Sequence, residues 1–295
     1  MNKRIADYNR LALLAFTIGC ARPHAETAPT AAVNRFAALS NAAALERSQL
    51  DSVVSDIHRL SGNTSPAVQA RLRELRRKAA SLDSSYRVTF ADLWSVVNGS
   101  ISGTASVASS FDVDMAPAPF VRAFADGSHW MLQSPLIQGF GKDRVYLIIV
   151  PRGFVTDFAS VPQPLQVLRG VRTVADRYAN AALVHDYLYW VQDCTREQAD
   201  RIMELALREA GISFLERKLI YEGLRQFGQS AWDAHRKERQ AGFLKTVGAP
   251  HDEVPPTGTW PEYREWLRSV RARSGVEYHV SQAVCAIADS LTTER

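Results

Sequence analysis

The sequence predicts an α+β fold in which a small antiparallel sheet packs on an antiparallel pair of helices, with a helical hairpin before both. Apolar residues recur at helical intervals through residues 33–60, which predicts a long amphipathic helix. β-Branched and aromatic residues gather between 129 and 150, which predicts strands. Capping-box patterns at Thr195 and at Ser213 predict the beginnings of two later helices.

The N-terminal part of the chain is predicted to form a helical hairpin over residues 31–97. The helix at 33–60 is followed by the turn Ser61–Pro66, rich in Ser, Gly and Asn, and by a second helix at 67–82. A basic cluster on the second helix either contacts phosphate groups or forms a solvated face, and the solvated face is the more common case. Its members are Arg71, Arg73, Arg76, Arg77 and Lys78.

A linker is predicted at residues 98–119, where Ser, Gly, Ala, Val and Asp predominate. A second domain, residues 120–242, follows it. Its first elements are strands at His129–Gln133 and Arg144–Val150, with a turn at Gln138–Asp143 between them. Two or three such strands make the small sheet.

Three helices are expected after the sheet. The first contains Asn180–Trp190, the second begins at Thr195, and the third begins at Ser213. The turn between the first two is tight, so they are expected to pack antiparallel. Residues 243–295 form an extension that is irregular apart from a helix at 261–273 and a second helix that begins at Ser281.

Composition and charge place the chain among soluble globular proteins. It has 295 residues, of which 46% are hydrophobic and 22% charged. The net charge of +4 is small, because 35 basic residues are balanced by 31 acidic ones, so nucleic acid is not expected as a partner. A phospholipid membrane is compatible with this charge. The sequence has no run of eighteen apolar residues, so no membrane span is expected.

The N-terminus has the pattern of an export signal. Lys3 and Arg4 precede the apolar stretch Leu11–Gly19, and Cys20 follows it, which together resemble a bacterial lipoprotein signal at residues 1–20. The chain would then be exported and anchored by lipid in the bacterial cell envelope. The alternative is an ordinary amphipathic helix and a cytoplasmic protein. If Cys20 carries lipid, Cys194 and Cys285 are left to form a disulfide in an oxidising compartment.

An acid–base arrangement is predicted around His185. If the two helices pack antiparallel about a turn near residues 193–194, His185 and Asp200 lie within about 3 Å of the same height. A carboxylate beside an imidazole fixes its tautomer and stabilises its protonated form. Tyr189 lies one turn after His185 on the same face, whereas Asp186 points about a quarter-turn away. The predicted catalytic residues are therefore His185, Asp200 and Tyr189.

A set of motifs between residues 130 and 232 resembles a known family. It comprises Gly153–Pro162, His185–Tyr189, Ala199–Asp200, Tyr221 and Arg225–Gly228. Together these motifs look closely like a phage and prophage family known only as domain of unknown function 1353. That resemblance implies no activity.

A second, local resemblance does imply an activity. The pattern His185-Asp186-x-x-Tyr189 on one helix, followed by Ala-Asp200 on the next, is similar to the catalytic helices of phospholipase A2. The resemblance implies that His185 activates water and that Asp186 binds calcium. It also implies that Asp200 orients the imidazole of His185, with support from Tyr189. Gly153 and Asp157 occupy the general place of that family's calcium loop. The implied function is a calcium-dependent hydrolysis of phospholipid esters, with calcium as the cofactor.

Two other functions remain open from the residues. His185, Asp186, Asp157 and Asp200 could instead be ligands of zinc or another transition metal in a hydrolase acting on cell-wall or phosphate substrates. Alternatively the polar cluster only locks the helices of a non-catalytic, phage-derived structural or interaction protein. For Asp157 a turn-forming role is favoured over a metal-binding one, since Thr156-Asp157 has the composition of an Asx-turn.

Overall fold

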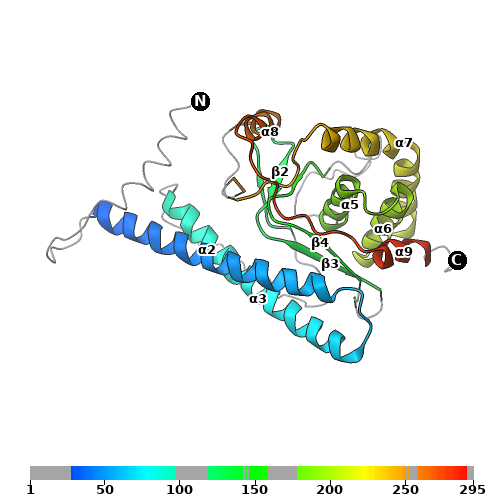
Figure 1. Cartoon of the computed structure of the whole chain (residues 1–295), viewed down its shortest axis with the longest axis horizontal. Coiled ribbons are helices and arrows are strands. Elements are labelled where there is room, and N and C mark those ends of the chain that lie inside the picture. Colours follow the sequence, from blue (N-terminus) through cyan, green and yellow to red (C-terminus); the bar gives the residue numbers. More distant parts are fainter. Residues whose placement is uncertain are drawn as a thin grey trace. The chain divides into compact units, whose positions relative to one another are not determined.

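The computed structural model of the chain describes residues 28–97, 119–141, 144, 146–158, 178–249, 251–252 and 258–290 (Figure 1). The described helices are α2 (Ala28–Leu60), α3 (Pro66–Val97), α5 (Ala179–Val191), α6 (Arg196–Glu209), α7 (Phe214–Gln240), α8 (Trp260–Ser269) and α9 (Gln282–Ser290). The strands are β1 (Val121–Ala123), β2 (Trp130–Leu132), β3 (Leu136–Phe140), β4 (Tyr146–Val150) and β5 (Val155–Thr156). The predicted α+β class is confirmed. The predicted signal at 1–20 and all but the last residue of the predicted linker lie outside the described residues.

The chain divides into two compact units, and their limits cross the predicted hairpin. Unit 1 contains residues 1–50 and 80–110, and unit 2 contains residues 51–79 and 111–295. Within unit 1, the hydroxyl of Ser85 on α3 donates a hydrogen bond to Glu46 on α2. Unit 2 holds the turn end of the hairpin together with the described strands β1 to β5 and the described helices α5 to α9.

Helix α3 is longer than its predicted extent of 67–82, since it continues to Val97. Its beginning follows the expected chemistry: Pro66 occupies the first helical position, and the Ser65 hydroxyl accepts a hydrogen bond from Val68 N at 3.3 Å. The added turns have weaker helix formers such as Ser and Thr. Packing compensates for them, because Tyr86 is 4% exposed and Arg87 pairs with Asp83 one turn earlier at 2.8 Å.

The strands form two small antiparallel sheets rather than one. The first has the order β1-β2-β5, and the second pairs β3 with β4 from Leu136↔Val150 to Phe140↔Tyr146. The prediction that Gln138–Asp143 is a turn was therefore wrong for Gln138–Phe140, which belong to β3. Gly139 suggested a turn, but its role is close packing, since a Cβ there would lie 2.7 Å from Arg144 Cβ.

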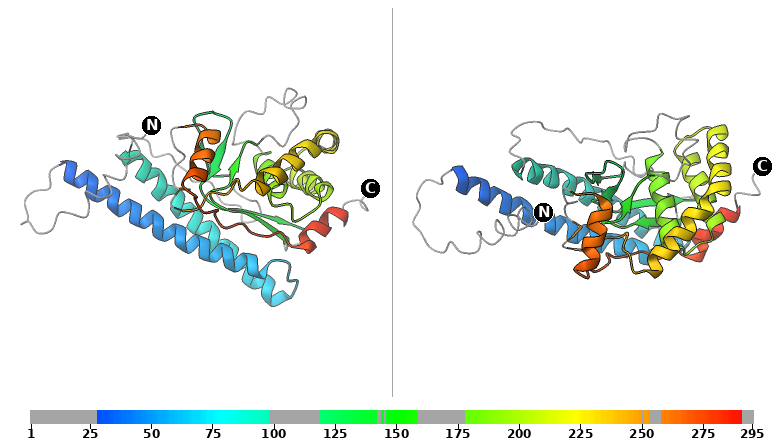
Figure 2. Two further views of the ribbon diagram at one scale, coloured as in Figure 1. Left: turned by 45° about the horizontal axis from the view of Figure 1, so that its top comes forward. Right: turned by 90° about the horizontal axis from the view of Figure 1, so that it is seen from above.

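Strand β2 contributes to two hydrophobic clusters of described residues in unit 2. Leu132 belongs to the larger cluster, which lies among β3, β4, α5, α6, α7 and α9. Its neighbour Met131 points to the other face of the strand and joins a smaller cluster with Trp260 and Leu267 of α8. In Figure 2, α8 (orange) lies near the C-terminal end of α7, and Arg264 of α8 donates hydrogen bonds to Glu238 of α7.

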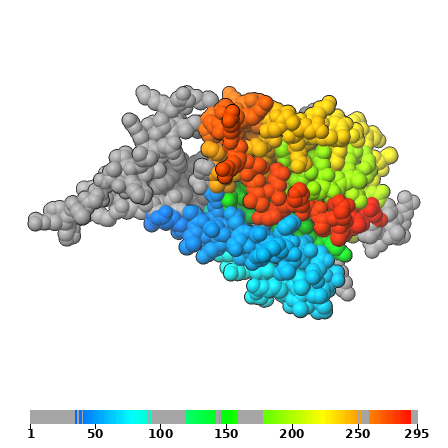
Figure 3. All heavy atoms as spheres, viewed as in Figure 1, coloured from blue at the N-terminus to red at the C-terminus, as the bar shows by residue number. Residues whose placement is uncertain are grey.

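Described residues after 242, within the segment predicted to be an extension, contribute to this core. Val247 bonds back to Gly153, and Val280, Val284 and Cys285 lie in the larger cluster. Figure 3 shows the orange and red residues of unit 2 running across the face of that unit that is in view. Among the described residues, no helix has the length and apolar character that crossing a bilayer requires.

Candidate functional site

The candidate site is built on α5, a helix with almost no exposed surface. Twelve of its residues are buried, which its sequence, apolar on all sides, requires of a helix in a globular protein. Its C-terminal end is set by Gln192, which adopts a left-handed conformation with φ 56°. The Thr195–Gln198 capping box, found as predicted, then begins α6. This short connection makes α5 and α6 antiparallel neighbours.

His185 and Asp200 meet across these two helices. His185 Nε2 lies 2.9 Å from Asp200 Oδ1, and each residue is 2% exposed. His185 and Asp200 lie at the same height on the two antiparallel helices, as predicted, and their side chains therefore form a direct hydrogen bond. The ring is held in place, and the buried carboxylate has an imidazole N–H as one of its donors.

Tyr189 completes the predicted triad. Its hydroxyl donates to Asp200 Oδ1 at 2.6 Å, and its ring centroid lies 4.1 Å from that of His185. Burial, followed by the negative charge of Asp200, raises the pKa of Tyr189, so the phenol stays protonated as a donor. Gly228 of α7 makes room for the hydroxyl, because a Cβ at this position would lie 2.4 Å from it.

Arg196 is the member of the site that sequence reasoning missed. Its Nη1 donates to Asp200 Oδ2 at 2.8 Å and to the Leu224 carbonyl at 3.4 Å. Burial would lower the pKa of Arg196, but the charges of Asp200 and Glu197 outweigh that and raise it. The available signal was the spacing, because residues four apart on a helix are neighbours.

Asp186 points away from this group, as its position one residue after His185 predicted. Its Oδ2 accepts a hydrogen bond from the Thr156 hydroxyl, and Asp186 is 6% exposed. Thr156 Oγ1 in turn accepts from Phe158 N at 3.0 Å. The hydroxyl of Thr156 therefore makes a side-chain turn at this place.

Gly153 has a backbone role away from the predicted calcium loop. Its φ is +80°, its carbonyl accepts a hydrogen bond from Val247 N at 2.9 Å, and a Cβ would lie 2.1 Å from the Val247 carbonyl oxygen. Only glycine fits this crossing of two chain segments. Asp157, the other predicted loop residue, is exposed.

The donor set does not assemble a complete metal site among the described residues. No three His, Cys, Asp or Glu side chains gather there in a metal-binding group, so the four-residue set suggested for zinc does not come together in that part of the chain. For calcium, which takes six to eight oxygens, Asp186 is a candidate ligand, whereas the Gly153 carbonyl is already engaged by Val247. No chemical step is therefore assigned to a metal.

Comparison with known proteins agrees with the predicted motif set. No curated protein and no solved structure matches the chain. Residues 130–224 match the family model described as "Protein of unknown function (DUF1353)". His185, Tyr189, Arg196 and Asp200 all lie within this range. The chain therefore carries a DUF1353 domain at residues 130–224, and its four-residue site belongs to that domain.

Proposed function

We propose that the chain is an ester hydrolase that acts on phospholipid and uses His185 as a general base toward water. The observation that carries the proposal is the 2.9 Å contact between His185 Nε2 and Asp200 Oδ1. Because a carboxylate accepts a hydrogen bond from Nε2–H, this contact favours the tautomer that has its lone pair on Nδ1. Within the described contacts, none uses Nδ1 of His185.

In the proposed reaction, Nδ1 takes a proton from water while the water oxygen attacks the ester carbonyl. The imidazolium that forms faces the Asp200 carboxylate, which stabilises it. It then returns the proton to the leaving alcohol as the ester C–O bond breaks, so the products are a fatty acid and an alcohol. Tyr189 and Arg196 act as positioning residues, because both hold the carboxylate that holds the ring.

Calcium dependence is a separate part of the proposal and concerns Asp186. This carboxylate follows His185 in the chain and accepts a hydrogen bond from the Thr156 hydroxyl, and the proposal assigns the cation to it. Calcium binding by the full chain, measured by calorimetry, is expected to be lost in Asp186→Asn. Equal binding by both proteins would remove Asp186 from the proposal without touching the role of His185.

A specific observation favours a second candidate, a non-catalytic structural or interaction protein, phage-derived as the family resemblance implies. His185 and Asp200 are each 2% exposed, so an ester can reach Nδ1 only after the surrounding structure moves. Buried polar groups that satisfy one another also occur where their only effect is to fix the packing of helices. The two candidates differ in whether His185 is needed for any reaction.

The deciding experiment measures fatty-acid release from mixed phospholipid vesicles by the purified full chain, with calcium and with a chelator. We expect release that falls by about a thousandfold or more in His185→Asn, because the general base is lost. His129→Asn, on the turn before β2, is the matched control and should keep full activity. A folded wild-type chain that releases no fatty acid under either condition would favour the non-catalytic candidate.

A further inference from the structure

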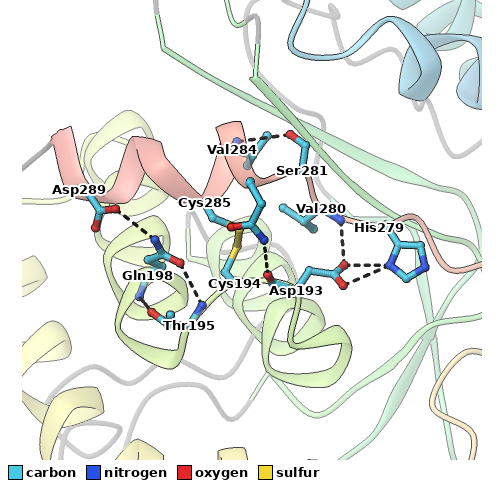
Figure 4. Close-up of a disulfide and its surroundings, with 11 residues drawn as sticks. Asp193, Cys194, Thr195, Gln198, His279, Val280, Ser281, Val284, Cys285 and Asp289 are labelled. Carbon is cyan, nitrogen blue, oxygen red and sulfur yellow. Dashed lines mark hydrogen bonds and ion pairs between the residues drawn. A yellow bond between two sulfur atoms is a disulfide. The ribbon is translucent and has the colours of Figure 1, made fainter.

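The C-terminal strap, which we define as residues 277–290, lies on the turn between α5 and α6 (Figure 4). The turn residue Asp193 is the main point of attachment. Its carboxylate accepts from Val280 N at 2.8 Å and lies 3.1 Å from His279 Nδ1, and its carbonyl accepts from Gln282 Nε2 at 3.0 Å. The strap is more than fifty residues beyond the end of the DUF1353 match at 224.

The strap also bonds to α5 before it reaches the turn. The Tyr187 hydroxyl donates to the Tyr278 carbonyl at 2.9 Å and accepts from Tyr278 N at 2.7 Å. Trp190 Nε1 donates to Glu277 at 2.8 Å. Tyr187 and Trp190 lie on the helix that carries His185, so the strap contacts the same helix as the candidate site.

A disulfide closes the arrangement. Cys194, in the α5–α6 turn, is bonded to Cys285 of α9, and the two are 91 residues apart in sequence. One further polar contact joins α9 to α6, where Gln198 Nε2 donates to Asp289 at 3.1 Å. Cys194 is 5% exposed and Cys285 is fully buried.

Besides these polar contacts and the disulfide, the strap contributes Val280 and three small residues of α9 to the larger hydrophobic cluster. Helix α9 is nine residues long, and helices of this length are marginal in water without tertiary contacts. Its buried side chains are small, namely Val284, Cys285 and Ala288. A disulfide that joins residues 91 positions apart removes more conformational freedom from the unfolded chain than one that closes a short loop.

We propose that the strap is a redox-dependent lock, which settles onto the α5–α6 turn only when Cys194 and Cys285 are oxidised to a disulfide. Oxidation occurs by exchange with a disulfide oxidant of the compartment. Two thiols lose two protons and two electrons to form the bond, and the oxidant's disulfide gains them and becomes two thiols. In a reducing compartment the strap stays open, so the locked form belongs to an oxidising one.

Because both sulfurs are buried, the disulfide is difficult to reduce once it has formed. A disulfide is exchanged by direct attack of a thiolate on sulfur, which requires access. Because Cys285 has no exposed surface and Cys194 almost none, the closed lock resists reductant as long as unit 2 stays folded. The lock is therefore set once, during folding, and its closing does not depend on the proposed hydrolysis.

The test is hydrogen exchange of the full oxidised chain against the Cys194→Ser/Cys285→Ser double variant, with mass-spectrometric thiol labelling under denaturing conditions. We expect amides 280–285 to exchange about tenfold faster or more in the double variant, while those of α5 keep their protection. Val280 N, Val284 N and Cys285 N are the hydrogen-bonded reporters. Cys20→Ser is the matched control, because it removes the third cysteine, and should leave this exchange unchanged.

Three outcomes would overturn the proposal. One is equal strap protection in the oxidised chain and the double variant. Another is two free thiols at Cys194 and Cys285 in chain that has been purified from an oxidising compartment with its strap protected. The third is uniform loss of protection throughout α5 and the strap in the double variant, since the disulfide would then be needed for the whole of unit 2.

Discussion

Asp200 is the residue on which the other members of the candidate site converge. Its two carboxylate oxygens accept from His185, Tyr189 and Arg196, at 2.9, 2.6 and 2.8 Å. A carboxylate that is 2% exposed is costly unless donors and a cation surround it, and Arg196 supplies the cation. The stability of the site and the orientation of the ring therefore depend on the same three contacts.

Replacing Arg196 by Met should destabilise the chain by about 3 kcal/mol, because the Asp200 carboxylate stays buried without its guanidinium. Urea denaturation followed by circular dichroism measures this. Arg225→Met removes an exposed ion pair with Glu222 on α7 and should cost about 0.5 kcal/mol or less. Equal losses in the two variants would show that Asp200 does not need Arg196.

Substituting Gly228 by Ala should cost about 1–3 kcal/mol, because the new Cβ meets the Tyr189 hydroxyl. The same substitution in a Tyr189→Phe background removes the atom that is met, and the added cost should fall to below about 1 kcal/mol. Thermal unfolding of the four proteins gives this double-mutant cycle. If Gly228→Ala destabilises the wild type and the Tyr189→Phe variant equally, the Tyr189 hydroxyl is not what excludes a Cβ at position 228.

Between neighbouring elements, single polar side chains make several of the joints in unit 2. Asp193 joins the α5–α6 turn to the strap, and Thr156 joins β5 to α5 through Asp186. Asp126 joins the β1–β2 turn to α8. One of its carboxylate oxygens accepts a hydrogen bond from Ser128 N and the other accepts one from Trp260 N, each at 2.9 Å. In each case the side chain satisfies backbone or hydroxyl donors of a second element.

The joint made by Asp126 predicts a loss of stability in acid. Burial opposes ionisation, but the backbone N–H of Trp260 and the other donors outweigh it and lower the pKa of Asp126 to about 2. A carboxyl whose folded pKa lies below its unfolded value of 3.8 stabilises the fold above pH 3.8, and this is lost as the pH falls toward 2. The stability of wild type should therefore decline more steeply than that of Asp126→Asn between about pH 4 and 2. Parallel pH profiles from chemical denaturation would contradict this.

For the molecule as a whole, the family match and the folding unit have different limits. The DUF1353 match covers residues 130–224, whereas unit 2 extends to residue 295 and includes residues 51–79. The smaller core cluster needs Trp260, Tyr263 and Leu267 of α8 to cover Met131 and Val155. The larger one includes Val280 and the α9 residues Val284, Cys285 and Ala288.

A chain that ends at residue 242 should therefore lose cooperative unfolding. It would expose Met131 and Val155, and the Gly153 carbonyl would lose the donor on Val247. Calorimetry is expected to show no sharp transition in the shortened chain, against one in the full chain. An unchanged transition temperature in the shortened chain would mean that residues 243–295 do not contribute to the stability of the domain.

Local chemistry was sufficient to predict the α+β class, the capping boxes at Thr195 and Ser213, and the meeting of His185 with Asp200. Each of these features depends on residues that are close in the chain, or on α5 and α6, whose short connection allows only antiparallel packing. The pairing of β3 with β4, the close approach of Gly228 to the Tyr189 hydroxyl, and the bond from Val247 to Gly153 depend on tertiary structure. They join segments whose contact is set by which buried surfaces fit together, and hydrophobic burial has no preferred partner until the packing chooses one.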